Sequence, residues 1–266
     1  MRKIIALDID GTLYNDEKKI TPVTAKALKT AQENGNIVVL ASGRPTPGLY
    51  IQSKELELEK YHGLLISYNG GKVTDVTTGE ILYENPVPNK IARKLLKHLE
   101  DFNVNPIVDD GKYIYTNNLT AFKNDFESQQ NRLELKKVDN IHDSVDFNPV
   151  KILIAAPHEI LFPVVDDICR PFENELSFVM SAPFYLEATV KGVTKADALK
   201  QIGERLGIDR KDIISFGDAE NDMSMIQFAG VGVAMGNACD ALKKAADMIT
   251  LSNNDDGIAY ALEKLL

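Results

Sequence analysis

The chain has 266 residues, of which 44% are hydrophobic and 26% are charged. These fractions are ordinary for a folded globular protein and exclude a disordered chain, and the length predicts one large domain or two of usual size. The formal net charge is -9, with 30 basic against 39 acidic residues. Such a balance argues against a broad basic surface for nucleic acid, although it leaves room for a local basic pocket.

The cysteine content and the N-terminal residues indicate the cellular compartment in which the protein is expected. The chain has two cysteines, Cys169 and Cys239, and no CxxC pair, so neither a disulfide framework nor a thiolate zinc site is expected. The opening MRKIIALDID reaches a carboxylate after a short apolar run, and no apolar stretch approaches about 18 residues. We therefore expect a cytoplasmic protein with no membrane association, no nucleic-acid partner and no obligate protein partner.

The first 70 residues alternate short apolar runs with helical patterns, which is typical of βαβ units. Thr21-Pro22 provides a helix cap and a first helical residue, and Gly35 suits the end of that helix. Lys72 to Tyr83 is predicted to form a hairpin that turns near Thr78-Gly79. Strands of a parallel sheet are predicted at residues 4–7, 37–41 and 64–68.

The character of the chain changes at Pro86 and Pro88, which bracket a predicted hinge. Residues 85–188 are expected to form an inserted α+β domain, in which Asp110-Gly111 marks a hairpin. Its strands are predicted at residues 107–108, 113–115, 151–155 and 176–180.

After this insert the alternation of strand and helix returns. A helix is predicted over residues 198–206, followed by strands at residues 213–216, 231–235 and 248–251. Residues 1–84 and 189–266 would thus form a discontinuous core. The predicted fold is α/β, with a doubly wound Rossmann-like parallel-sheet core and an inserted α+β cap domain.

Two acidic segments follow predicted strands of this core. Asp8 and Asp10 stand two residues apart, so both carboxylates can face one pocket, and Gly11 permits the backbone to turn sharply. Asp218 and Asp222 follow the strand at residues 213–216 in an equivalent position. Two such loops at one sheet edge would form an oxygen-rich site suited to Mg²⁺. The alternatives are an ordinary Asp-Gly turn and an acidic helix N-terminus.

Ser42, Gly43 and Arg44 end the second strand, where a hydroxyl and an accessible backbone N–H could hold a phosphoryl oxygen. Lys195 opens the helix predicted after the insert, so its ammonium could offset phosphate charge at the same sheet edge. The alternatives are a simple strand exit and a solvated helix lysine.

Taken in order, these segments resemble the haloacid dehalogenase superfamily, whose phosphatases carry DxDGT, a Ser or Thr, a Lys and an acidic GDxxND loop. The further motifs LASGRP, SYNGG, SAPFYLEA, GVTK and SFGDAENDMSMI resemble its Cof-type subfamily, in particular YidA-like sugar phosphatases with a type C2B cap. The resemblance covers essentially the whole chain. The departures remove no catalytic group: Ser42 stands where Thr is common, Thr194 where Ser is common, and Ala196 and Ala219 where Gly is common.

The resemblance implies that Asp8 is the nucleophile, which forms an aspartyl-phosphate. Asp10 would be the acid that protonates the leaving alkoxide and would then activate water. Such chemistry needs one ionised and one protonated carboxyl group at the start. The resemblance also implies that Asp8, the backbone carbonyl of Asp10 and Asp218 bind Mg²⁺, with Asp222 acting through water or indirectly.

The phosphoryl oxygens would be held by five groups, namely the Ile9 amide, Ser42, Gly43, Lys195 and Asn221. For Arg44, a contact with substrate or cap and a structural ion pair remain alternatives.

The preferred hypothesis is a Mg²⁺-dependent phosphatase of small phosphorylated metabolites, most of all sugar phosphates. A phosphosugar mutase is the nearest enzymatic alternative, because it also needs both Asp8 and Asp10. A metabolite-binding regulator without catalytic activity belongs to a different class of function. Such a protein would lack catalytic groups, whereas this sequence contains all of them. The cap, residues 85–188, is expected to select the leaving group.

Overall fold

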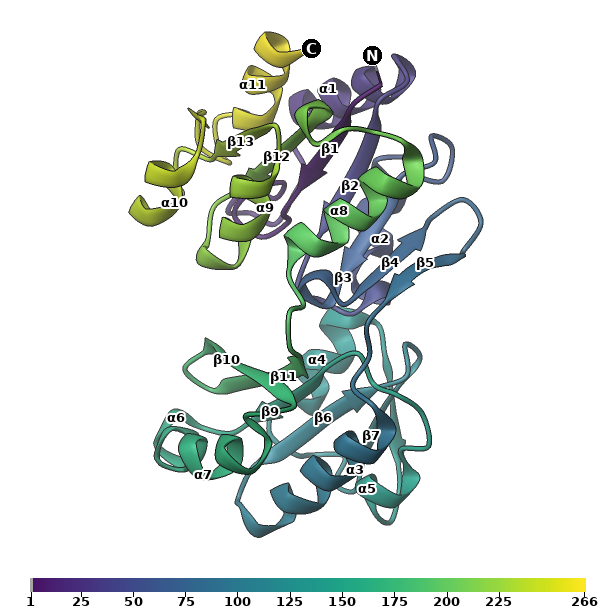
Figure 1. Ribbon diagram of the computed structural model, residues 1–266, viewed down its shortest axis with the longest axis vertical. Coiled ribbons are helices and arrows are strands. Elements are labelled where there is room, and N and C mark those ends of the chain that lie inside the picture. Colours follow the sequence, from purple (N-terminus) through teal and green to yellow (C-terminus); the bar gives the residue numbers. More distant parts are fainter. Residues whose placement is uncertain (1) are drawn as a thin grey trace. The chain divides into compact units, whose positions relative to one another are not determined.

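The structure is a computed structural model that describes residues 2–266, and the chain divides into two compact units (Figure 1). The first unit combines the chain up to Tyr83 with Thr194–Leu266, and the second is Glu84–Val193. Both are sheets covered by helices, so the α/β fold class is confirmed. Among residues 2–266, no helix is both long enough and apolar enough to cross a membrane.

The first unit is built on an eight-stranded sheet with the order β14-β13-β12-β1-β2-β3-β4-β5. Neighbouring strands from β14 to β3 run parallel, and β4 returns antiparallel to β3. The strands are β1 (Ile4–Leu7), β2 (Ile37–Ala41), β3 (Leu64–Ser67), β4 (Lys72–Asp75), β5 (Ile81–Glu84), β12 (Ile213–Gly217), β13 (Val231–Ala234) and β14 (Met248–Ile249).

Helices cover both faces of this sheet, which is why its central strands are apolar along their whole length. On β1, Leu7 packs in one cluster with Leu28, whereas Ala6 packs in another with Leu199. The predicted doubly wound core is therefore confirmed. The helices are α1 (Pro22–Glu33), α2 (Tyr50–Glu55), α8 (Lys195–Leu206), α9 (Met223–Phe228), α10 (Asp240–Ala245) and α11 (Gly257–Leu265).

Helix α1 begins as its sequence predicts. The Thr21 side chain accepts a hydrogen bond from the amide of Thr24, and Pro22 is the first helical residue. The helix ends at Glu33, and Gly35 follows with a left-handed φ of 88°.

The second unit is built on a six-stranded sheet with the order β10-β11-β9-β6-β7-β8. Its strands are β6 (Asn105–Asp109), β7 (Tyr113–Thr116), β8 (Glu134–Lys137), β9 (Ile152–Ala155), β10 (Leu176–Ala182) and β11 (Tyr185–Val190). Its helices are α3 (Asn89–His98), α4 (Asn124–Asn131), α5 (Ile141–Ser144), α6 (His158–Leu161) and α7 (Val165–Cys169).

Two strands of this unit, β8 and β11, lie outside the predicted set. The sequence also placed the end of the insert at residue 188, whereas the compact unit extends to Val193. The difference has a simple cause, because β11 continues to Val190 and pairs there with Leu176 of β10. Whether this unit is a type C2B cap stays a prediction from the sequence.

Helix α1 provides a test of the core. Leu28 is fully buried, whereas Val23 on the same helix is 53% exposed. We expect Leu28→Ala to lower the free energy of unfolding by about 2–5 kcal/mol, because it leaves a cavity beneath the sheet. The matched variant Val23→Ala is expected to change it by less than about 0.5 kcal/mol. Urea denaturation of both variants measures the difference, and equal effects would contradict this packing.

Candidate active site

The predicted site residues gather at the carboxyl ends of the central parallel strands. Strands β1 and β12 are neighbours, with Leu7 paired to Phe216, and the amide of Asp8 donates to the carbonyl of Phe216 at 3.1 Å. Asp8 and Asp218 therefore follow adjacent strands at one edge. This edge is the place where open α/β sheets bind ligands.

Lys195 joins the two acidic segments. Its Nζ donates to Oδ1 of Asp8 and to Oδ1 of Asp222, both at 2.6 Å, and its side chain is wholly buried. Burial by itself lowers the pKa of Lys195, but the two carboxylates outweigh this effect and raise it above its ordinary value. The lysine is therefore a permanent cation between two loops.

Asp222 fixes the loop that follows β12. Its Oδ2 accepts hydrogen bonds from the amides of Asp218 at 3.0 Å and Ala219 at 3.1 Å, while Oδ1 accepts from Lys195. A Cβ on Gly217 would come within 2.5 Å of the Asp222 Cβ, so this close approach requires glycine. Asp222 thus has both oxygens engaged by the protein, which fits an indirect role better than direct coordination.

Oxygens of Asp8, Asp218 and Asp222 all lie within 4.8 Å of one another, so this cluster could hold a cation on Asp8 and Asp218 with Asp222 close by. The hydroxyl of Thr12 donates to Oδ1 of Asp218 at 2.8 Å and orients that carboxylate. Gly11 has a φ of 84°, and a Cβ there would lie 2.4 Å from Oδ2 of Asp218. The turn after β1 therefore brings the backbone directly against this carboxylate.

The electrostatics of this cluster show an excess of negative charge. Burial raises the pKa of Asp8 to about 8, and the neighbouring carboxylates of Asp222 and Asp218 add to the effect against the opposing influence of Lys195. Burial likewise raises the pKa of Asp218 to about 6. One ammonium does not balance three carboxylates. An all-oxygen donor set with this charge fits a hard divalent cation.

Asp10 has the opposite surroundings. Its Oδ2 accepts from Arg44 Nη2 at 2.6 Å and Nε at 3.2 Å, and its Oδ1 accepts from Lys18 Nζ at 2.9 Å. Burial opposes ionisation, but Arg44 and Lys18 outweigh it and hold the pKa of Asp10 below its ordinary value. The resemblance implies an ionised Asp8 beside a protonated Asp10. In this structure the pKa shifts run in the reverse order, because burial dominates at Asp8 despite Lys195, whereas Arg44 and Lys18 outweigh burial at Asp10.

Of the residues expected to hold phosphate, Ser42 and Gly43 follow β2, Ile9 follows β1, and Lys195 begins α8. The Ser42 hydroxyl accepts from the Arg44 amide at 3.2 Å, and Ile9 is buried between Asp8 and Asp10 in the chain. Gly43 lies close to the side chain of Asn69, to whose Oδ1 Asn221 donates at 3.4 Å. The structure therefore brings Ser42, Gly43 and Asn221 into one neighbourhood, with Asn69 among them.

Four further residues of the site had no role in the sequence analysis. Thr12 belongs to the segment DIDGT, which matches the DxDGT motif, and Asn69 belongs to SYNGG, so a signal for both residues was present. The other two residues belong to no motif that the sequence shows. They are Lys18, which binds Asp10, and Asn237, whose side chain donates to the Gly11 carbonyl at 2.8 Å.

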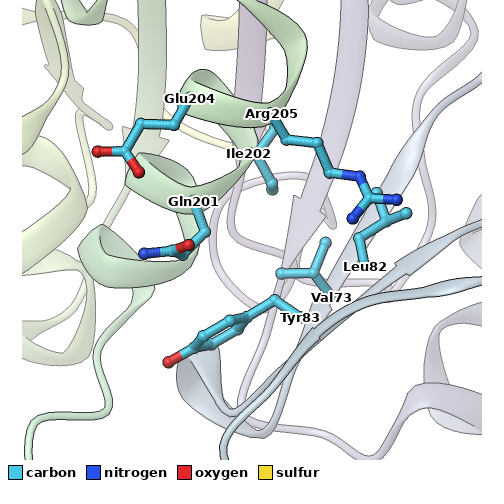
Figure 2. A pocket seen from close by; sticks show the side chains of 7 residues that line it. All are labelled: Val73, Leu82, Tyr83, Gln201, Ile202, Glu204 and Arg205. Atoms are coloured by element: carbon cyan, nitrogen blue, oxygen red, sulfur yellow. The ribbon is translucent and has the colours of Figure 1, made fainter.

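A separate hollow of about 340 Å³ lies beside α8 in the first unit (Figure 2). Figure 2 shows that its walls come from strands β4 and β5 and from the later turns of α8. It contains none of the predicted site residues, and Arg205 at its rim donates to Glu80 at 2.7 Å. The lining residues are Val73, Leu82, Tyr83, Gln201, Ile202, Glu204 and Arg205.

Comparison with known proteins gives full-length matches. Residues 5–262 match the family model of haloacid dehalogenase-like hydrolases. The 5-amino-6-(5-phospho-D-ribitylamino)uracil phosphatase YitU of Bacillus subtilis is 30% identical over 98% of this chain and 96% of its own. A haloacid dehalogenase-like hydrolase from Bacteroides thetaiotaomicron has the same fold with a TM-score of 0.94, 36% identity and full coverage of both chains. The subclass IIB sugar phosphatase BT4131 has a TM-score of 0.80 and 25% identity, over 99% of this chain and 98% of its own.

The raised pKa values of Asp8 and Asp218 predict how cation binding depends on pH. Because the folded protein holds protons on these groups that the unfolded chain loses above about pH 4, stability without a cation falls as pH rises from about 4 to 8. A divalent cation displaces those protons. We therefore expect saturating Mg²⁺ to raise Tm more at about pH 8 than at about pH 5.

Differential scanning fluorimetry in EDTA and in MgCl₂ measures this difference, with Asp218→Asn as a variant that should lose most of the Mg²⁺ effect. An equal rise in Tm at both pH values would contradict the assignment of the cation to this cluster.

Proposed function

Since the chain belongs to the haloacid dehalogenase-like hydrolase family, we propose that it is a Mg²⁺-dependent phosphatase of small phosphorylated metabolites, in particular sugar phosphates. The observation that carries the proposal is the carboxylate of Asp8, which stands at the end of the central strand β1 with Lys195 at 2.6 Å. Asp218 and Asp222 place two further carboxylates beside it. A nucleophile, a fixed cation and an oxygen-rich metal site are thus combined in one cluster.

In the first step, an oxygen of Asp8 attacks phosphorus, and the bond from phosphorus to the leaving oxygen breaks. Lys195 keeps Asp8 oriented and supplies positive charge where the phosphoryl group passes. The Ile9 amide, Ser42, Gly43 and Asn221 would donate to the phosphoryl oxygens. Most of the acceleration then comes from positioning and charge stabilisation, as is general for phosphoryl transfer.

Asp10 is assigned the proton transfers. A phosphate ester that enters the site brings negative charge near Asp10 and competes for Arg44 and Lys18, and both effects raise the pKa of Asp10 toward a protonated state. Protonated Asp10 gives its proton to the leaving alkoxide. It then takes a proton from the water that attacks the aspartyl-phosphate, which releases inorganic phosphate and restores Asp8.

The divalent cation would be held by Asp8, Asp218 and the backbone carbonyl of Asp10, with Asp222 orienting the loop. When bound, the cation neutralises the excess negative charge and polarises a phosphoryl oxygen. Asp222 contributes indirectly, because its two oxygens already accept from Lys195 and from two amides.

The substrate class is supported by what the related proteins act on. The Bacillus subtilis relative is named for a phosphorylated ribityl compound, and BT4131 is described as a sugar phosphatase. Both names describe leaving groups of sugar or sugar-alcohol type. The closer YidA-like placement and the cytoplasmic location stay predictions from the sequence.

We expect Asp8→Asn to lower phosphate release at least about a thousandfold, because the amide has nearly the same shape but is not a nucleophile. Phosphate release from p-nitrophenyl phosphate in MgCl₂ measures this loss, and a circular dichroism spectrum like that of the wild type with a cooperative thermal transition shows that the fold is intact. Identification of inorganic phosphate as the product from a sugar phosphate distinguishes the phosphatase from a mutase. Turnover close to that of the wild type would overturn the covalent mechanism.

The role of Asp10 predicts a dependence on the leaving group. Asp10→Asn should lower kcat for an alkyl phosphate by about 10²- to 10⁴-fold, since an alkoxide needs a proton as it leaves. The loss should be much smaller for p-nitrophenyl phosphate, whose phenolate leaves without protonation. Steady-state kinetics with both substrates measure the contrast, and equal losses would argue against a general acid at this position.

A further inference from the structure

The turn that follows β1 carries Asp10, to which the proposed mechanism assigns the proton transfers. The amide of Tyr14 donates to the carbonyl of Ile9 at 2.8 Å, which closes the turn. Gly11 lies in the middle of it with a φ of 84°, and glycine has a wider choice of backbone conformations than any other residue. The peptide group after Gly11 therefore needs a contact from outside the turn to hold one orientation.

An asparagine from another loop supplies this contact. Nδ2 of Asn237, in the loop after β13, donates to the carbonyl of Gly11 at 2.8 Å. Its Oδ1 accepts from the backbone amide of Asn253, in the loop after β14, at 2.9 Å. A side-chain amide carries a donor and an acceptor in one plane, so it can join a carbonyl to an amide, whereas a carboxylate has acceptors alone. Asn237 thus holds the backbone directly after Asp10.

The second asparagine holds the end of the same turn. Asn253 is only 6% exposed, and its Nδ2 donates to the carbonyl of Tyr14 at 3.0 Å. Tyr14 in turn forms an isolated β-bridge with Asp10. The loops after β13 and β14 therefore hold the turn at two carbonyl groups, those of Gly11 and Tyr14.

The loop that carries Asn237 is also fixed to the second acidic segment. The amide of Met235 donates to the carbonyl of Gly217 at 3.0 Å, and the amide of Cys239 donates to the carbonyl of Asp218 at 2.9 Å. Asn237 lies between these two anchored residues in the chain. Its bond to the turn after β1 consequently keeps that turn in a constant position relative to Asp218.

The stability of the fold does not account for this asparagine. The Asn237 side chain is exposed, and an exposed polar group exchanges a lost hydrogen bond for one with water at little cost. Building on the proposed function, we infer that Asn237 is a positioning residue. It holds the turn after β1 so that the carboxyl group of Asp10 can reach the leaving oxygen of the substrate.

The test compares ribitol phosphate, whose leaving group is an alkoxide, with p-nitrophenyl phosphate at saturating substrate and MgCl₂. Asn237→Ala removes both hydrogen bonds, whereas Asn237→Asp has nearly the same shape and loses only the donor to Gly11. Each variant should lower kcat for ribitol phosphate by about 10- to 100-fold, because a small misplacement of a reacting group greatly slows the reaction. The loss for p-nitrophenyl phosphate should be much smaller, since its phenolate leaves without a proton. The ratio of the two kcat values is independent of how much active enzyme is present.

Asn36 provides a matched control at the opposite edge of the sheet. It directly precedes β2, its Nδ2 donates to the carbonyl of Ala31 and its Oδ1 accepts from the amide of Lys3, both at 3.0 Å. Asn36→Ala therefore removes the same two kinds of hydrogen bond. Because Asn36 is buried, this variant should lower Tm more than Asn237→Ala does, yet leave the ratio of kcat values unchanged.

A double-mutant cycle shows whether Asn237 acts through Asp10. Once Asp10→Asn has removed the acid, its exact position no longer matters to the leaving group. Adding Asn237→Ala to Asp10→Asn should therefore change the ratio of kcat values by less than about twofold, because the two effects are not independent. A further loss of the size seen in the single variant would contradict the inference.

The outcomes separate the two levels of the proposal. If neither phosphate ester is hydrolysed, or if Asp8→Asn does not change turnover, the proposed function fails. If Asp8→Asn abolishes turnover but the Asn237 variants lower kcat equally for both substrates, or raise KM alone, the phosphatase assignment stands. In that case the positioning role of Asn237 is overturned.

Discussion

The buried ammonium of Lys195 is the interaction on which the geometry of the site depends. It lies at the first residue of α8 and joins the end of β1, through Asp8, to the loop after β12, through Asp222. A buried carboxylate without such a partner would strongly destabilise the folded protein. The buried lysine is likewise tolerated only because two carboxylates accept hydrogen bonds from it. Asp222 in turn accepts hydrogen bonds from the backbone amides of Asp218 and Ala219, and these bonds set the position of the Asp218 carboxylate.

The part of this arrangement that follows from the sheet was predictable from the sequence. The apolar runs at residues 4–7 and 213–216 indicate buried parallel strands, and carboxylates directly after two such strands meet at one edge. Contacts between loops were not predictable in the same way. Lys18 reaches Asp10 from an exposed segment in which Lys18 itself has a left-handed φ of 59°, and no periodic pattern encodes that conformation.

Prediction was weakest in the second unit, because two of its strands carry polar residues. Strand β8 carries charged residues at three of its four positions, and β11 places Glu187 and Thr189 among apolar residues. Neither strand shows the continuous apolar run that marks strands of the first unit. On β11, Glu187 and Thr189 alternate with Leu186 and Ala188, which are buried in the large apolar cluster of this unit. A strand with polar residues on one face has no continuous apolar run, so its sequence does not mark it as the strands of the first unit are marked.

The charges around Asp8 give a physical reason for the proposed dependence on a divalent cation. Four carboxylates face three cationic side chains, namely Asp8, Asp10, Asp218 and Asp222 against Lys18, Arg44 and Lys195. With all of them ionised, the cluster is negative and repels a phosphate dianion. Burial and the neighbouring carboxylates raise the pKa of Asp8 to about 8, which favours its protonated form, and a protonated carboxyl group is a poor nucleophile. In the proposed mechanism, a divalent cation held by Asp8 and Asp218 would reverse the sign of the cluster and favour the ionised form of Asp8. Substrate attraction and activation of Asp8 would then depend on the same bound charge.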